Sequence, residues 1–175
     1  TPEAIEAYNE AEGSRALLYR VSALVDRNTA IQAALARGTS LPEAERAELG
    51  RGFERNQTQI RLFTPLAKYL ATESCDSITR DAIQVHGGIG FMAESTVGKL
   101  HLDGIITTIY EGTSEIQVSF ALKEIGKGAL GIVFDELRKE LGSLGQATLH
   151  PFAEKIMAGI ERIEESSVAL IRDFG

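Results

Sequence analysis

The feature that most constrains the fold is a long amphipathic pattern at the start of the chain. From Glu3 to about Arg37, apolar residues recur at close to the spacing of one helix face: Ile5, Tyr8, Ala11, Leu17, Leu18, Val21, Leu24, Val25, Ile31 and Leu35. This period predicts a long α-helix that buries one stripe of its surface. Because such a stripe needs partners, we expect a helical bundle.

A second helix is predicted to begin shortly afterwards. Ser40, with Glu43 three residues later and Pro42 in the first turn, is typical of a helix start. The helix should run to about Thr72, weakened near its two glycines. Pro65 lacks an amide donor and should kink the helix or mark a restart. The two glycines are Gly50 and Gly52.

The remaining periodic segments are also helical. Helices are expected over residues 76–86, 113–127, 132–141 and 152–170, with a glycine-punctuated segment over 87–112. The chain has only 4 Pro and no Trp, and strand patterns are nearly absent. The sequence therefore predicts an all-α protein, with a helical bundle over residues 1–130 and a helical extension over 131–175 packed on the same unit.

Charge and cysteine content exclude several classes of function. The formal net charge is -7 and the basic residues are scattered, so a nucleic-acid partner is not expected. The single cysteine, Cys75, cannot form an intrachain disulfide, which fits a reducing compartment, and we expect a cytoplasmic protein. No run of 18 apolar residues occurs, so membrane insertion is not expected. The three histidines lack metal-ligand spacing, so no metal site is predicted.

Glycines punctuate the segment Gln84-Val85-His86-Gly87-Gly88-Ile89-Gly90-Phe91. At a helix end they permit positive φ and let a bulky ligand such as a cofactor approach the backbone. Taken alone, the glycines are explained more simply by a plain helix cap followed by a loop. A relaxed match to the dinucleotide-binding fingerprint is rejected, because that fingerprint needs a preceding buried strand and residues 76–86 predict a helix.

A second unusual segment reads Ile109-Tyr110-Glu111-Gly112-Thr113-Ser114-Glu115-Ile116-Gln117. Glu111 lies just before a predicted helix start, where Thr113 and Ser114 can cap free amides. Helix starts attract anionic groups. From the residues alone, Glu111 could therefore be simply a favourable partner of the helix dipole.

Together, in this order and at this spacing, the two segments resemble the acyl-CoA dehydrogenase family. Its C-terminal helical domain carries Gln-x-x-Gly-Gly-x-Gly followed by Ile-Tyr-Glu-Gly-Thr-x-x-Ile-Gln. The resemblance covers residues 10–127 and includes the upstream residues 64–68 and 71–73. It implies a helical domain of a larger flavoenzyme whose N-terminal helical domain and central β-domain lie outside this chain. By itself, the chain is then expected neither to hold FAD tightly nor to turn over substrate.

The resemblance also implies a chemistry. In this family, the flavin oxidises an acyl-CoA thioester to trans-2-enoyl-CoA, and a glutamate removes the α-proton. Glu111 matches that base, and Gly112 matches the residue against the thioester. A base of this kind needs a site from which water is excluded, because desolvation makes a carboxylate more basic.

Cofactor and partners follow in the same way. The neighbouring subunit's FAD is expected to contact Gln84, Val85, His86, Gly87 and Gly88, and the domain's own FAD to lie near Thr113, Ser114 and Glu115. A shared site implies a homo-oligomer, a dimer or tetramer. Electron-transfer flavoprotein is the expected electron acceptor.

Some features leave alternatives open. Leu102 and Ile105 stand where the family typically has arginines, whereas Asp103 is retained. These losses favour a non-catalytic helical interaction module that kept only the scaffold. An acyl-CoA oxidase or a nitroalkane oxidase would keep the flavin and change the reaction, although Glu rather than Asp at position 111 argues against the second. Residues 132–175 resemble the extra helices of larger family members.

Overall fold

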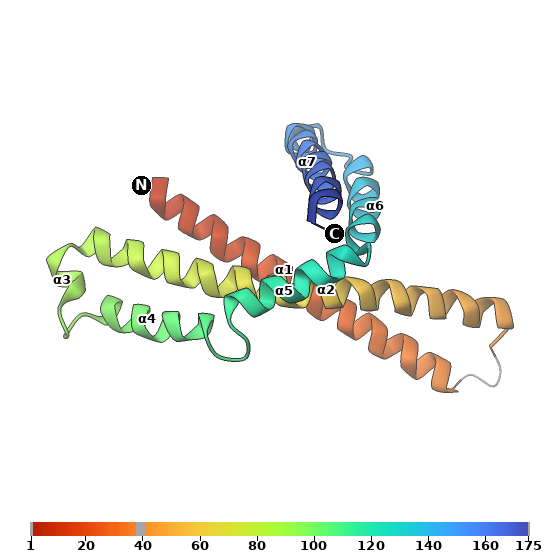
Figure 1. Ribbon diagram of the computed structural model, residues 1–175, viewed down its shortest axis with the longest axis horizontal. Coiled ribbons are helices and arrows are strands. Elements are labelled where there is room, and N and C mark those ends of the chain that lie inside the picture. Colours follow the sequence, from red (N-terminus) through yellow and green to blue (C-terminus); the bar gives the residue numbers. More distant parts are fainter. Residues whose placement is uncertain (1, 38–40, 175) are drawn as a thin grey trace. The chain divides into compact units, whose positions relative to one another are not determined.

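The structure is a computed structural model that describes residues 2–37 and 41–174. Every regular element in these ranges is an α-helix or a short 3-10 helix, so the all-α prediction is confirmed (Figure 1). None of the helices in the described ranges combines the length and apolar character needed to cross a bilayer.

The chain forms two compact units, Thr1–Lys123 and Glu124–Gly175. The first contains α1 (Pro2–Arg37), α2 (Glu43–His86), α3 (Gly88–Phe91), α4 (Thr96–Ile105), η1 (Ile106–Thr108) and most of α5 (Ser114–Gly126). The second contains α6 (Ala129–Gly142), η2 (Ala147–Leu149) and α7 (His150–Phe174). The expected domain division after residue 130 stays a prediction.

In the first unit, α2 is the central helix. It packs antiparallel against α1, and its C-terminal half packs against α3 and α4 (Figure 1). The buried apolar residues of α1 and α2 are Val21, Leu24, Leu62 and Ala67. Removing such side chains from water supplies most of the favourable free energy for pairing two helices.

A polar layer interrupts the apolar contact between α1 and α2. Asn28 is buried, and its Nδ2 donates to the carbonyl of Phe53 and to Oε1 of Gln57, each at 3.2 Å. Asn56 Nδ2 donates in turn to Asn28 Oδ1 at 3.0 Å. Buried amides are tolerated when they are hydrogen-bonded, so this layer is compatible with the surrounding core.

The prediction of two separate helices over residues 43–86 is wrong, because α2 is one helix of 44 residues. It continues through Gly50, Gly52 and Pro65. Proline removes one hydrogen bond from the ladder and its ring crowds the preceding turn, but Pro65 is buried beside the buried Leu62 and Ala67, and burial of apolar surface offsets that cost. The helix begins at Glu43, whereas Ser40 lies outside the described residues.

Helix α4 was not predicted by the sequence pattern, which assigned residues 87–112 only as glycine-punctuated. Its glycines are not helix breaks. Gly104 is buried, and a Cβ there would lie 3.0 Å from the sulfur of Cys75 on α2. Here glycine permits close approach of two helices.

The second unit is a pair of helices, α6 and α7. Val133 and Phe134 of α6 and Ile160 of α7 are buried. Arg138 Nη2 donates to Glu164 Oε2 at 2.6 Å and so links the two helices. This hydrogen bond raises the pKa of the Arg138 guanidinium above its ordinary value.

Candidate functional site

Glu111 lies in a tight turn between η1 and α5. Its φ is 54°, and it is the only non-glycine residue with positive φ among the described residues. Gly112 follows with a φ of 99°. A left-handed conformation in a residue other than glycine costs about 1–3 kcal/mol and persists only where surrounding contacts enforce it. Such strain is concentrated at functional sites.

Lys68 of α2 provides one of those contacts. Its Nζ donates to the carbonyl oxygens of Thr107 and Gly112, both at 2.8 Å. Gln117 of α5 provides another, because its Nε2 donates to the carbonyls of Glu111 at 3.2 Å and Gly112 at 3.4 Å. The main chain on either side of Glu111 is therefore tied to two helices.

The side chain of Glu111 is not used in holding the turn. It is exposed, and its carboxylate has no hydrogen bond or ion pair with the described part of the chain. Gly112 has a structural reason to be glycine, since a Cβ would lie 2.5 Å from Gln117 Nε2 at a positive φ. The turn therefore presents a free carboxylate on a constrained backbone.

The start of α5 adds a third attachment. Thr113 Oγ1 accepts from the amide of Ile116 at 3.4 Å, as a helix cap does. Ser114 Oγ donates to Glu73 Oε1 of α2. Both hydroxyls are thus engaged within the chain, whereas Glu115, in the first turn, is exposed.

The glycine-rich corner lies at the C-terminal end of α2. Gln84, Val85 and His86 form its last turn and are exposed. Gly87 then ends the helix with φ 61° and ψ -145°, a conformation that favours glycine. Gly88 has neither a positive φ nor any atom within 4 Å of where a Cβ would stand. The fold therefore requires glycine at position 87 and not at position 88.

The corner and the Glu111 turn do not form one compact site. Lys68, beside the turn, and Gln84, at the corner, are separated along α2 by about 24 Å at 1.5 Å per residue. The predicted site residues thus fall into two groups, Gln84 to Gly88 and Glu111 to Glu115, at different places on the first unit.

A cavity of about 580 Å³ lies beside the corner, among α2, α3 and α4. Gln84 is the only predicted site residue that lines it. Arg80 and Lys99 bring positive charge to its wall, and Leu102 is one of its apolar residues. A cavity with an apolar surface and two cations suits an anionic ligand with an apolar body.

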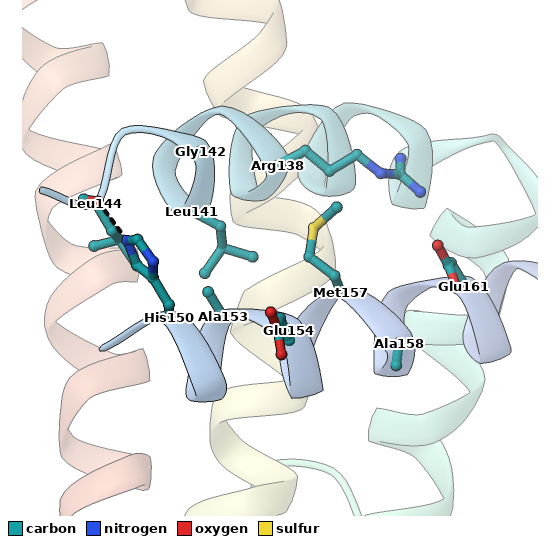
Figure 2. Close-up of a pocket in the computed structure, with 10 residues that line it drawn as sticks. All are labelled: Arg138, Leu141, Gly142, Leu144, His150, Ala153, Glu154, Met157, Ala158 and Glu161. Atoms are coloured by element: carbon teal, nitrogen blue, oxygen red, sulfur yellow. Dashed lines mark hydrogen bonds between the residues drawn. The ribbon is translucent and has the colours of Figure 1, made fainter. Parts of the chain in front are cut away.

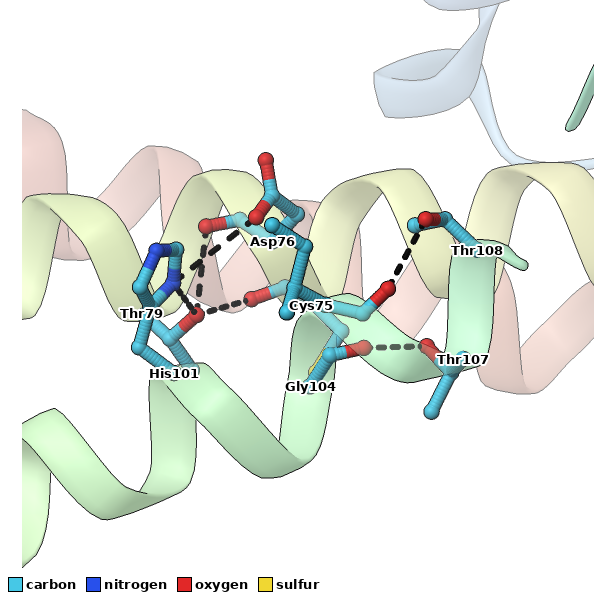
Figure 3. A network of polar contacts seen from close by, with 8 residues as sticks. Cys75, Asp76, Thr79, His101, Gly104, Thr107 and Thr108 are labelled. Atoms are coloured by element: carbon cyan, nitrogen blue, oxygen red, sulfur yellow. Dashed lines mark hydrogen bonds and ion pairs between the residues drawn. The ribbon is translucent and has the colours of Figure 1, made fainter. Parts of the chain in front are cut away.

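Polar contacts join α2 to α4 next to this cavity (Figure 3). Thr79 Oγ1 donates to the carbonyl of Cys75 at 2.7 Å and lies 3.0 Å from Nδ1 of His101. Because a hydroxyl has one proton, we assign the proton of the second bond to His101 Nδ1. That nitrogen also lies 3.7 Å from Asp76 Oδ1. His101 therefore has a structural role, and no group of metal ligands occurs among the described residues.

A second cavity, of about 510 Å³, lies within the α6–α7 unit (Figure 2). Arg138, Met157 and His150 are among its lining residues, and His150 Nε2 lies 3.4 Å from the carbonyl of Leu144. None of the predicted site residues lines it.

Comparison with known proteins relates these features to one family. Residues 44–126 match the model described as acyl-CoA dehydrogenase, C-terminal domain. This range includes the glycine-rich corner, the Glu111 turn and the lysine that holds it. No solved structure matches the chain.

Three curated relatives illustrate the similarity. The chain is 29% identical to 3-methylmercaptopropionyl-CoA dehydrogenase of Ruegeria pomeroyi over 162 residues, which cover 90% of this chain and 24% of the relative. It is 48% identical to the mitochondrial short-chain specific acyl-CoA dehydrogenase of Sus scrofa over 52 residues, which cover 30% of this chain and 13% of the relative. It is 44% identical to the caffeyl-CoA reductase–Etf complex subunit of Acetobacterium woodii over 52 residues, which cover 30% of this chain and 14% of the relative.

The chain thus spans between 13% and 24% of the length of these relatives. The match to the Ruegeria protein covers 90% of this chain, so it extends beyond α5 into the second unit. The helical fold, the order of the two segments and the matched family model agree. Residues 44–126 of the chain therefore resemble a C-terminal domain of the acyl-CoA dehydrogenase family.

Proposed function

We propose that the protein is an FAD-dependent acyl-CoA dehydrogenase in which Glu111 removes the α-proton of an acyl-CoA thioester. The observation that carries this proposal is the backbone of Glu111, held at a φ of 54° by contacts from α2 and α5 while its carboxylate stays free. A plain partner of a helix dipole needs no such strain. A positioned general base does need a fixed backbone and an unpaired carboxylate.

The residues at the glycine-rich corner fit a bulky cofactor. No atom lies within 4 Å of a Cβ placed at Gly87 or Gly88, so a ligand can approach the main chain there. Arg80 and Lys99 in the adjoining cavity can balance phosphate charge. We propose that Gln84 to Gly88 contact FAD of a neighbouring subunit, and that Thr113, Ser114 and Glu115 lie near the domain's own FAD. The separation along α2 is consistent with two different cofactor molecules.

The proposed reaction removes two hydrogens from the thioester. The C2–H bond breaks and its proton goes to the carboxylate of Glu111, and bound FAD would supply the oxidising chemistry as the acceptor of the C3 hydrogen as hydride. The electron pair left at C2 completes the C2=C3 bond of the enoyl product. Gly112, next to the base, has no side chain that could obstruct a thioester.

Partners follow from the same proposal. Val85 and Phe91 at the corner are 76% and 86% exposed, and apolar side chains exposed to this degree favour cover by another subunit. We propose a homo-oligomer, dimer or tetramer, with electron-transfer flavoprotein as acceptor, since one relative is named for an Etf complex.

The single cysteine supports the cytoplasm as the compartment of the protein.

The test is anaerobic mixing of the intact, FAD-loaded protein with a panel of acyl-CoA thioesters, following loss of the flavin's visible absorption. Glu111→Gln should slow this bleaching by about 10²- to 10⁴-fold, because it removes the base and keeps the size of the side chain. Glu45→Gln is the matched control, since Glu45, in the first turn of α2, is also an exposed carboxylate near the start of a helix. Equal bleaching rates in Glu111→Gln and Glu45→Gln would show that Glu111 is only a partner of the helix dipole.

A second function, that of a helical interaction module without chemistry, is favoured by one observation. Leu102 and Ile105, in place of the family's arginines, are 70% and 43% exposed. The same experiment separates the two, because a module of this kind would show no bleaching with any thioester.

A further inference from the structure

The strained turn at Glu111 depends on contacts with α2 that the sequence motifs do not include. Tyr110 and Glu111 lie between the two carbonyl groups, of Thr107 and Gly112, that accept hydrogen bonds from the same ammonium. The donor, Lys68, is part-buried and stands 39 and 44 residues away from its two acceptors. One side chain therefore closes both ends of the turn.

We propose that Lys68 is a positioning residue for the reaction: its ammonium holds the Glu111 turn in the conformation that aims the carboxylate at the α-carbon. This inference rests on the proposed function. Lys68 does not touch the reacting atoms, and it acts through the main chain of Thr107 and Gly112.

The chemistry of the contact supports this role. An ammonium has three donors and no acceptor, and hydrogen bonds from a charged donor to a carbonyl are stronger than neutral ones. Gln117 also binds the Gly112 carbonyl, but at 3.4 Å, and it does not bind Thr107. Without Lys68, the Thr107 carbonyl on the η1 side of the turn loses its hydrogen bond to α2. The main chain of Glu111 can then leave its left-handed conformation. A misplacement of about 1 Å at a catalytic group can cost on the order of 100-fold in rate.

The experiment compares Lys68→Met, Lys68→Arg and Lys155→Met in the intact, FAD-loaded protein. Methionine keeps the length and apolar stem of lysine and removes the donors, whereas arginine keeps charge and donors. Lys155, an exposed lysine of α7, is the control. Rates are expressed per bound flavin, so a loss of folded protein does not count as a loss of rate.

Lys68→Met should lower kcat by about 100-fold with little change in KM. Lys68→Arg should recover most of that loss, and Lys155→Met should behave as wild type. Hydrogen exchange of the amides of residues 107–113 should accelerate in Lys68→Met alone. If Lys68→Met does not fold, Lys68→Gln, which keeps an amide donor but is too short to reach both carbonyls, should show the same changes to a smaller degree.

A 3-thia-acyl-CoA separates this inference from the proposed function. Its α-proton is acidic but its β-sulfur cannot yield a hydride, so a long-wavelength charge-transfer band with oxidised flavin reports proton removal alone. The role of Lys68 would be overturned if Lys68→Met kept the wild-type kcat and the wild-type charge-transfer band. It would also be overturned if Lys68→Met lost kcat and Lys68→Arg did not recover it. Normal chemistry in Glu111→Gln would overturn the proposed function instead, whatever the Lys68 variants show.

Discussion

At the scale of single residues, the turn at Glu111 shows how the two motifs differ in what the fold demands. Gly112 is glycine for a local reason, because its φ and its contact with Gln117 exclude a side chain. Glu111 has no local reason to be glutamate, because its carboxylate binds nothing in the described chain. A residue that the fold does not require is the stronger candidate for function.

The same comparison at the glycine-rich corner gives a prediction. Gly87→Ala should lower the free energy of unfolding by about 1–3 kcal/mol, because alanine is strained at that φ and ψ. Gly88→Ala should change it by less than about 0.5 kcal/mol, since open space surrounds the position. If Gly88 lies against FAD, its alanine variant should nevertheless weaken FAD binding.

Thermal unfolding of the apoprotein and titration with FAD measure these two effects separately. Wild-type FAD affinity in Gly88→Ala would remove the corner from the cofactor site. A stability loss in Gly88→Ala equal to that of Gly87→Ala would mean that glycine serves the fold at both positions.

At the scale of elements, the sequence predicted α1, α5, α6 and α7 because each carries apolar residues at one helical spacing. It did not predict α4 or the continuity of α2. Propensity treats Pro65 and Gly104 as breaks, whereas tertiary packing overrides that local preference. The family resemblance includes Lys68 within residues 64–68, but the sequence did not predict its contacts, since contacts across 39 and 44 residues have no signature in a single chain.

The close approach of α4 to α2 can be tested through Gly104 and Cys75. Gly104→Ala should lower the free energy of unfolding by about 1 kcal/mol, because overpacking of about 1–3 kcal/mol against the sulfur outweighs a gain of about 1 kcal/mol in helix propensity. In a Cys75→Ala background, the same change should stabilise by about 1 kcal/mol, since its other neighbours lie at 3.7 and 4.0 Å.

Denaturant unfolding of wild type, both single variants and the double variant gives the coupling energy between the two positions. If Gly104→Ala lowered the free energy of unfolding equally with and without the Cys75 sulfur, that sulfur would not be what limits the approach of α4 to α2.

At the scale of the whole molecule, the chain consists of two compact units, and each has buried residues of its own. Only the first contains the predicted site residues. The function of α6 and α7 is therefore not carried by the two family motifs, although the Ruegeria relative extends its similarity into them.

If the two units open independently, a cavity in one should leave the other protected. Ile160 of α7 is 3% exposed, so Ile160→Ala should cost about 2–5 kcal/mol locally. Hydrogen exchange should then accelerate in α6 and α7 and stay unchanged in α1 and α2. Faster exchange throughout the chain would instead show one cooperative unit.

The polar layer between α1 and α2 has a further consequence for how the chain finds its native pairing. Several helices here expose apolar stripes, α7 among them, and hydrophobic contact alone does not distinguish one stripe from another. Asn28 does distinguish them, because it needs the Phe53 carbonyl and the Gln57 and Asn56 amides at matching heights. Docked on a purely apolar stripe, each orphaned amide would cost about 1–3 kcal/mol. The polar layer therefore makes the pairing of α1 with α2 specific. A helix without polar groups at the positions that Asn28 contacts pairs less favourably with α1 during folding.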